Sequence, residues 1–189
     1  MLNTNFSSRS KFFFAVGIQV LILLTIIVYK MAILSGGVAV LLRIEPVDPR
    51  DPLRGDYVTF RFSNISSISS YYTENESFAN GETIYVSLEK NGKYWTQEKA
   101  SHKKPTGGIF LKGKVISGGK EGHVNSLTPQ TNRSSNTLRV EYGIENYFIP
   151  EGTGINFNFT SRNASAVVMV DENGSAVLKQ LYIDDKPWP

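Results

Sequence analysis

An uncharged stretch of 18 residues, Phe12–Tyr29, is the feature that most constrains what this chain can fold into. As an α-helix, with a rise of about 1.5 Å per residue, it would extend roughly 27 Å, and about 34 Å if it continued to Leu34. Such lengths match the hydrocarbon core of a bilayer. We therefore predict a membrane-spanning signal-anchor helix over residues 12–34, which would place the bilayer itself among the partners of the chain. Lys30 near its end is expected to extend its ammonium group to the lipid headgroups.

A cleaved signal peptide is the alternative, because it too has a basic start and an apolar middle. Its apolar region usually spans only about 7–15 residues, so the length favours a retained anchor. Arg9 and Lys11 precede the span, which predicts that residues 1–11 form a cytoplasmic tail in the cell (inner or plasma) membrane. The domain over residues 38–189 is then expected to be extracytoplasmic, or periplasmic in a two-membrane envelope.

The formal net charge of +3 comes entirely from the first 30 residues. Arg9, Lys11 and Lys30 are the only charged side chains there, whereas residues 31–189 carry 17 basic and 17 acidic side chains. The excess positive charge therefore flanks the apolar span, where it sets orientation. A nucleic-acid partner is not expected, because the outer domain has no net positive charge to attract phosphates.

Cysteine is absent and histidine occurs only twice. This excludes disulfides and thiolate metal sites, and His102 and His123 lack the spacing of a helical ligand pair. We expect no metal and no cofactor. His102 is followed by Lys103 and Lys104, which with Lys99 are expected to form a solvated rim.

Short segments rich in β-branched and aromatic residues, separated by Gly, Asn, Pro and Ser, follow the span. They predict about eight strands: Val38–Ile44, Tyr57–Phe62, Thr83–Lys90, Lys93–Lys99, Ile109–Val115, Thr137–Tyr142, Ala164–Val170 and Ser175–Ile183. No strand–helix–strand rhythm is present, so we predict a mainly β fold, an antiparallel β-sandwich or partly open β-barrel after one transmembrane helix.

The connections between these strands also carry signals. Asn91-Gly92 and Asn173-Gly174 are each expected to form a type I′ hairpin turn, because both residue types tolerate positive φ. Gly143–Phe148 is expected to form one helical turn, and Ser66–Phe78 a loop or short irregular helix. Residues 118–135 have no apolar period and are expected to form a mobile surface loop.

The densest local motif runs from Glu45 to Phe62. Its three prolines, spaced by three residues, forbid a helix and favour a stiff extended loop. Arg54-Gly55-Asp56 is then expected to turn the chain into the strand Tyr57–Phe62, with Val58, Phe60 and Phe62 on the core face.

This motif resembles the signature of the bacterial GDYXXLXY family. Gly55, Asp56 and Tyr57 match it, while Phe60 replaces the leucine and Phe62 the final tyrosine. The resemblance continues through the segments Pro46–Asp51, Leu111–Val115, Glu141–Gly152 and Val168–Ile183. It implies a membrane-anchored extracytoplasmic domain, working beside a multipass membrane protein and without an established biochemical activity.

Arg54, Asp56 and Glu151, with Gly55 and Tyr57, form the candidate contact site for a ligand or partner. If the arginine and the two carboxylates converge, the guanidinium would grip an anionic group. The competing interpretation is turn chemistry, in which Asp56 accepts backbone amides and Glu151 lies in a Pro-Glu-Gly turn.

The basic tail, single span and Arg-Gly-Asp strand entry also resemble the start of a type I signal peptidase. The corresponding segment Arg43–Val47 has no serine, and without a nucleophile that mechanism does not run. We therefore expect no enzyme but a non-catalytic interaction or assembly module. The alternatives are an envelope-acting enzyme that uses Arg54, Asp56 and Glu151, and a lipid- or glycan-binding barrel.

Overall fold

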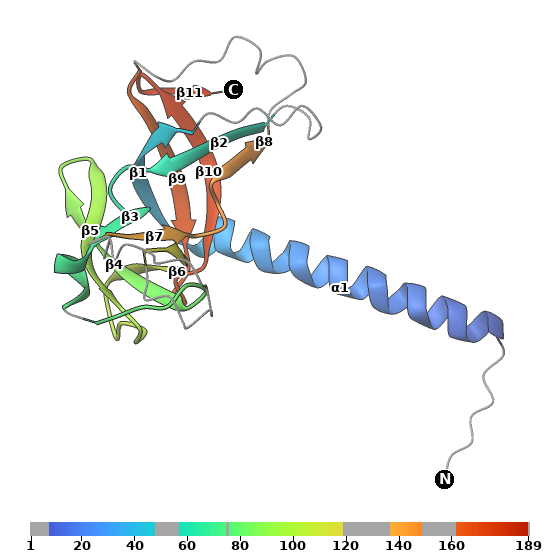
Figure 1. The fold of residues 1–189 in the computed structure, drawn as a ribbon. Coiled ribbons are helices and arrows are strands. Elements are labelled where there is room, and N and C mark those ends of the chain that lie inside the picture. The colour runs from blue at the N-terminus through green and yellow to red at the C-terminus, as the bar shows by residue number, and fades with distance from the viewer. Residues whose placement is uncertain (1–7, 48–56, 75, 119–136, 149–161, 189) are drawn as a thin grey trace, which may run out of the picture.

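The computed structural model describes residues 8–47, 57–74, 76–118, 137–148 and 162–188. One long helix, α1 (Ser8–Gly36), projects away from a β-domain (Figure 1). Its side chains are exposed along almost the whole length, and Ile33 is its only buried residue. By length and composition α1 can cross a bilayer. The expected apolar span is therefore present as one unbroken helix.

Eleven strands and one 3₁₀ turn lie in the part of the chain that the structure describes. All pairings are antiparallel and form two sheets, with the strand orders β11-β10-β9-β1-β2-β8 and β3-β7-β6-β4-β5. The bounds are β1 Val38–Pro46, β2 Tyr57–Phe62, β3 Ser67–Ser69, η1 Ser70–Thr73, β4 Thr83–Asn91, β5 Tyr94–Ser101, β6 Ile109–Ser117, β7 Thr137–Glu141, β8 Asn146–Phe148, β9 Ala164–Val170, β10 Ala176–Ile183 and β11 Lys186–Trp188. The predicted all-β antiparallel fold is confirmed.

Each of the eight predicted strands is present, and the additional strands β3, β8 and β11 have three residues each. The prediction of a helical turn over Gly143–Phe148 is wrong. Gly143 has φ +76°, and the Glu145 carboxylate accepts the amides of Tyr142 and Ile144. The chain therefore turns back and forms β8 against β2. Ser66–Phe78, expected as a loop or short helix, contains β3 and η1.

Both type I′ predictions are also wrong. In the β4–β5 hairpin Asn91 pairs with Tyr94, so the central turn residues are Gly92 and Lys93. Only Gly92 has positive φ, at +63°, which is the requirement of a type II′ turn. The β9–β10 connection is longer. There Gly174 N–H donates to the Asp171 carbonyl, and Gly174, at φ +77°, supplies the left-handed residue of a three-residue loop.

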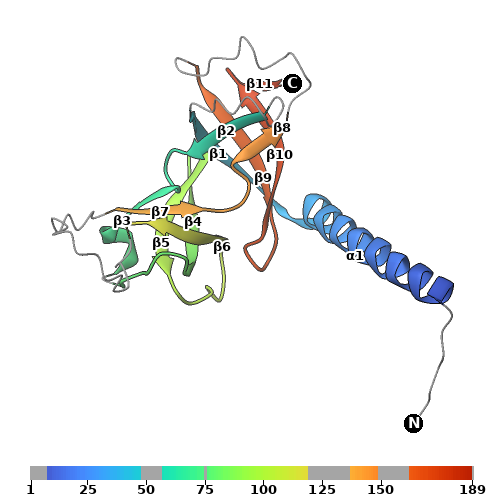
Figure 2. The ribbon, with the colours of Figure 1, turned by 45° about the vertical axis from the view of Figure 1, so that its right-hand side comes forward.

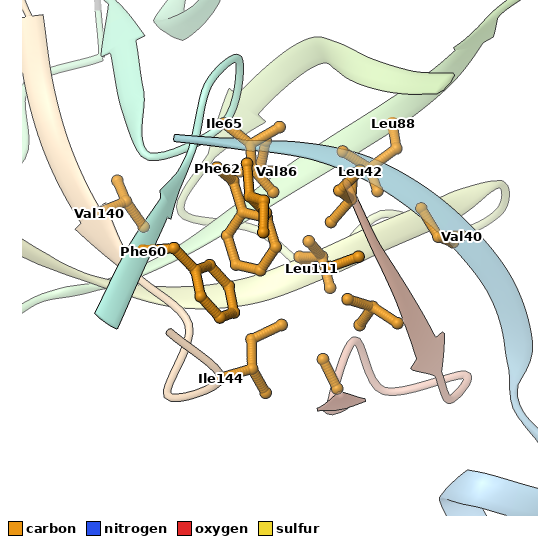
Figure 3. Close-up of a cluster of buried hydrophobic side chains, with 14 of the residues drawn as sticks. Val40, Leu42, Phe60, Phe62, Ile65, Val86, Leu88, Leu111, Val140 and Ile144 are labelled. Carbon is orange, nitrogen blue, oxygen red and sulfur yellow. The ribbon is translucent and has the colours of Figure 1, made fainter. Parts of the chain in front are cut away.

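The hydrophobic core lies between the two sheets (Figure 3). The side chains of Val58, Phe60 and Phe62 are buried in it, as the alternation along β2 predicts. The rings of Phe60 and Phe62 meet edge to face, with centroids 5.5 Å apart. From the other sheet, Val86 and Leu111 are fully buried in the same cluster. The core therefore depends on side chains from both sheets.

Candidate functional site

The candidate site predicted from the motif falls mainly outside the described residues. Arg54, Gly55, Asp56 and Glu151 lie there, as do most of the residues expected as a mobile loop, from 119 onward. Tyr57 begins β2, and its backbone is the register partner of Phe148 at the end of β8. The convergence of Arg54, Asp56 and Glu151 stays a prediction.

The junction between α1 and β1 is the first feature of the described residues that bears on function. Helix and strand are separated only by Gly37, whose N–H donates to the Ile33 carbonyl at 2.8 Å. A Cβ on Gly37 would lie 2.7 Å from that carbonyl oxygen and 2.9 Å from the carbonyl oxygen of Val170 on β9. Only glycine fits here, because the end of α1 and the backbone of β9 approach so closely.

The β9–β10 hairpin makes the second contact with the helix. Its tip extends toward α1 (Figure 2), where the Tyr29 hydroxyl donates to Ser175 Oγ at 3.0 Å. Asp171 Oδ1 accepts the amides of Asn173 and Ser175 and so holds the loop in shape. The tip is also joined to the other sheet, because the Lys112 amide donates to the Gly174 carbonyl. The helix, the hairpin and both sheets are therefore mechanically connected.

A groove of about 510 Å³ lies between this hairpin and the end of α1. We call it the junction groove. Its lining residues are Tyr29, Ala32, Ile33, Gly36, Gly37 and Val38 on one side and Gly108, Ile109 and Val170–Asn173 on the other. Its volume lies within the usual range for small-molecule sites, roughly 300–1,000 Å³. The junction groove is the candidate site that sequence reasoning missed, because its two walls come from segments far apart in the chain.

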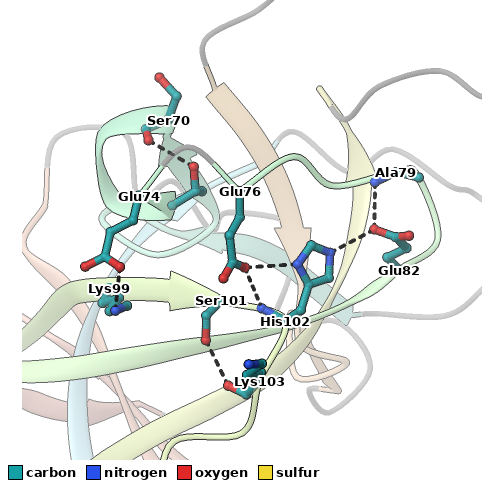
Figure 4. A network of polar contacts seen from close by, with 10 residues as sticks. Ser70, Glu74, Glu76, Ala79, Glu82, Lys99, Ser101, His102 and Lys103 are labelled. Atoms are coloured by element: carbon teal, nitrogen blue, oxygen red, sulfur yellow. Dashed lines mark hydrogen bonds and ion pairs between the residues drawn. The ribbon is translucent and has the colours of Figure 1, made fainter.

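Apart from the junction groove, the described residues contain a polar cluster around His102 (Figure 4). Its Nδ1 lies 2.9 Å from Glu76 Oε2 and its Nε2 lies 3.1 Å from Glu82 Oε2. The imidazole also stacks on Phe78, with ring centroids 3.9 Å apart. A neutral imidazole can donate from only one nitrogen, so both contacts are donated only by the imidazolium form. In its imidazolium form, His102 therefore ties the segment containing Phe78 to the end of β5 through both carboxylates.

The charges of this cluster shift one another's pKa values. The hydrogen bond to Glu82, followed by that to Glu76, raises the pKa of His102 above its ordinary 6.5. The backbone amide of His102 lowers the pKa of Glu76, and the amide of Ala79 lowers the pKa of Glu82, both below 4.5. A raised histidine pKa gives stability that is lost as pH rises, and a lowered glutamate pKa gives stability that is lost as pH falls. The cluster therefore stabilises the fold most between about pH 4.5 and 6.5.

A Glu82→Gln substitution is expected to lower the pKa of His102 toward 6.5, because the amide removes the charge of the main partner of the imidazole. An NMR titration of the imidazole signals in the full chain measures this directly. Glu98→Gln is the matched control, because Glu98 is an exposed residue of the neighbouring strand β5. Equal His102 titration in both variants would contradict the assignment.

The lysines near His102 do not act as one basic patch. Lys99 Nζ lies 2.7 Å from Glu74 Oε2, whereas Lys104 Nζ donates to Asn173 Oδ1 at 2.8 Å, on the β9–β10 tip. Lys104 Nζ also lies 5.9 Å from the centre of the Phe110 ring. Lys99 on β5 therefore pairs with the segment before β4, whereas Lys104 contacts the hairpin tip beside the junction groove.

A long apolar helix joined directly to an antiparallel β-domain fits the class of membrane-anchored β-domains. The sequence profile described as GDYXXLXY protein matches residues 19–181, and the chain belongs to this family. The match includes the second half of α1 and nearly all of the β-domain. Comparisons with curated proteins and with solved structures gave no match.

Proposed function

We propose that this protein is a single-pass protein of the cell (inner or plasma) membrane whose extracytoplasmic β-domain is a non-catalytic interaction or assembly module beside a multipass membrane protein. The observation that carries the proposal is the rigid junction between α1 and β1. Gly37 alone separates helix and strand, and Ile33, at 3 % exposure, is packed into the joint. A domain that meets freely diffusing substrates needs only a flexible tether. A fixed orientation suits a partner that is itself held in the membrane.

The exposed surfaces support the same proposal. The apolar side chains of α1, such as Leu21 at 64 % exposure, are available to lipid or to another membrane helix. On the β-domain, Tyr71 is 83 % exposed and meets Tyr72 edge to face. Aromatic residues are enriched where proteins bind each other. Arg9 and Lys11 before the span support a cytoplasmic N-terminus.

In-cell photo-crosslinking tests this function. A photoreactive residue replaces Leu21 in one variant and Tyr71 in another, and crosslinked proteins are identified by mass spectrometry. We expect both positions to capture the same multipass membrane protein. Inserting ten Gly and Ser residues between Gly36 and Gly37 is expected to abolish the Tyr71 crosslink, because it frees the orientation of the domain.

The Leu21 crosslink in the insertion variant is the internal control, because the insertion leaves the anchor unchanged. If the Tyr71 crosslink survives the insertion, orientation does not matter and the rigid-junction argument fails. If neither position captures a membrane protein, the assembly role is wrong.

A further inference from the structure

The position of the β9–β10 tip beside α1 sets the depth of the helix in the bilayer. Tyr29, which bonds to Ser175, precedes the helix end at Gly36 by about two turns, or roughly 10 Å. The tip also carries the carboxylates of Asp171 and Glu172 and its own loop backbone. Charged groups and irregular backbone do not lie exposed in hydrocarbon. The hydrocarbon region therefore ends near Tyr29, and the last two turns of α1 lie among the headgroups.

This depth places the junction groove at the level of the phospholipid headgroups. Ala32, Ile33 and Gly36 form its helical wall, so the groove is continuous with the lipid-facing surface of the span. Gly36 and Gly108 leave open space, because a Cβ on either would meet nothing within 4 Å. A molecule from the bilayer surface can therefore enter the groove without displacing side chains at these positions.

Opposite charges border the groove. The exposed Glu172 lines it, and Asn173, the next lining residue, accepts a hydrogen bond from Lys104 Nζ at 2.8 Å. Carboxylates bind ammonium groups, and lysine binds phosphate as a compact positive charge. The apolar Ala32 and Ile109 lie on opposite walls of the same groove. The lining thus offers two carboxylates and an apolar surface at headgroup depth, and the ammonium group of Lys104 lies at its border, on Asn173. Asp171 Oδ1 already accepts two amides of the loop, so Glu172 is the carboxylate left for a ligand.

We propose that the junction groove binds the headgroup of a zwitterionic phospholipid that carries a primary ammonium group. The ammonium contacts Glu172, the phosphate contacts Lys104, and the glycerol end of the lipid lies against Ala32 and Ile109. The inference depends on membrane anchoring and is independent of the multipass partner.

Lipid retention in native mass spectrometry tests the binding. The full chain is reconstituted into nanodiscs that contain phosphatidylethanolamine and phosphatidylglycerol in equal amounts, and is then released in mild detergent. We expect one retained phosphatidylethanolamine per chain. Glu172→Gln is expected to reduce its retention roughly tenfold, the effect of losing one hydrogen bond to a charged group. Gly36→Leu is expected to abolish retention, because the new side chain fills the groove.

Gly17→Leu is the matched control for the glycine variant, since Gly17 also lies on α1 in open surroundings. Glu98→Gln is the control for the loss of one exposed carboxylate. Equal retention of lipid by Gly36→Leu and Gly17→Leu would overturn the proposal, as would equal retention of both lipids by the unmodified chain. A dimer that Gly36→Leu dissociates would assign the groove to a second copy and would also overturn it. Glu172→Gln, at an exposed side chain, keeps the test valid if Gly36→Leu does not fold.

Cysteine labelling tests the depth of α1 separately. The chain contains no cysteine, so single substitutions report without background. In proteoliposomes, a membrane-impermeant maleimide is expected to label Met31→Cys at least tenfold faster than Leu24→Cys. Both side chains are exposed in the protein, at 60 % and 53 %, so only the lipid distinguishes them. Equal protection of both positions would place the last turns of α1 in hydrocarbon and overturn the headgroup assignment.

Discussion

Replacing Phe60 with alanine is expected to lower the free energy of unfolding by about 3–5 kcal/mol, the usual cost of removing a buried aromatic ring. Phe60 is completely buried between the sheets and packs edge to face on Phe62. The cavity left behind lies where side chains from both sheets meet, so neither sheet can close it alone. Chemical unfolding of the full chain in detergent micelles, followed by tryptophan fluorescence, measures the loss.

Arg61→Ala is the matched control for this prediction. Arg61 is the next residue on β2, and its side chain faces outward. Its removal is expected to change the free energy of unfolding by no more than about 0.5 kcal/mol. Similar losses for the two variants would mean that the face of β2 assigned to the core is wrong.

Replacing Gly37 with valine is expected to disrupt the joint between helix and domain and to lower the free energy of unfolding by about 1–3 kcal/mol. The new Cβ would lie within 3.0 Å of two backbone carbonyl oxygens, and backbone atoms cannot move aside as a flexible side chain can. Either the end of α1 or β9 must shift. Spin labels on Leu24→Cys and Glu98→Cys report the change as a broader helix-to-domain distance distribution.

Gly36→Ala is the control, because a Cβ on Gly36 meets nothing within 4 Å. It is expected to keep both the stability and the narrow distance distribution. A narrow distribution in Gly37→Val would show that the tight approach at this glycine does not hold the domain in place. The rigid junction would then no longer support the proposed assembly role.

The two predictions rest on different kinds of sequence signal. The burial of Phe60 follows from the alternation of Val58, Phe60 and Phe62 in a strand, which local sequence alone reveals. Local sequence does not reveal the role of Gly37, because part of its crowding comes from the backbone of Val170, far along the chain. A glycine after an apolar helix is equally compatible with a flexible tether. Only the pairing of β1 with β9 excludes that interpretation.

The errors in the predicted turns have the same physical origin. Asn91-Gly92 contains the residues of a type I′ turn, but the β4–β5 register moves the centre of the turn to Gly92-Lys93. At Gly143–Phe148 the side chain of Glu145 accepts two local amides, and the pairing of β8 with β2 outweighs the helical tendency of the segment. Both outcomes depend on which strand pairs with which.

The contacts of His102 are another feature that local sequence does not reveal. The sequence predicts a solvated rim of lysines beside this histidine, and Lys103 and Lys104 are indeed exposed. It does not predict their partners: the fold brings Glu76 and Glu82 to the two ring nitrogens of His102, while Lys104 extends to the hairpin tip. Residues close in sequence thus have different partners, because a strand end and the loop after it point to different parts of the domain.

The sequence by itself determined the apolar span, its flanking charges, the antiparallel β class and the core face of β2. These properties depend on composition and on periods of a few residues, which are local. The tertiary structure alone decided the rigid joint at Gly37, the charge cluster of His102 and the junction groove. Each requires contacts between segments distant in the chain, and such contacts follow from strand order and register, which no local pattern specifies.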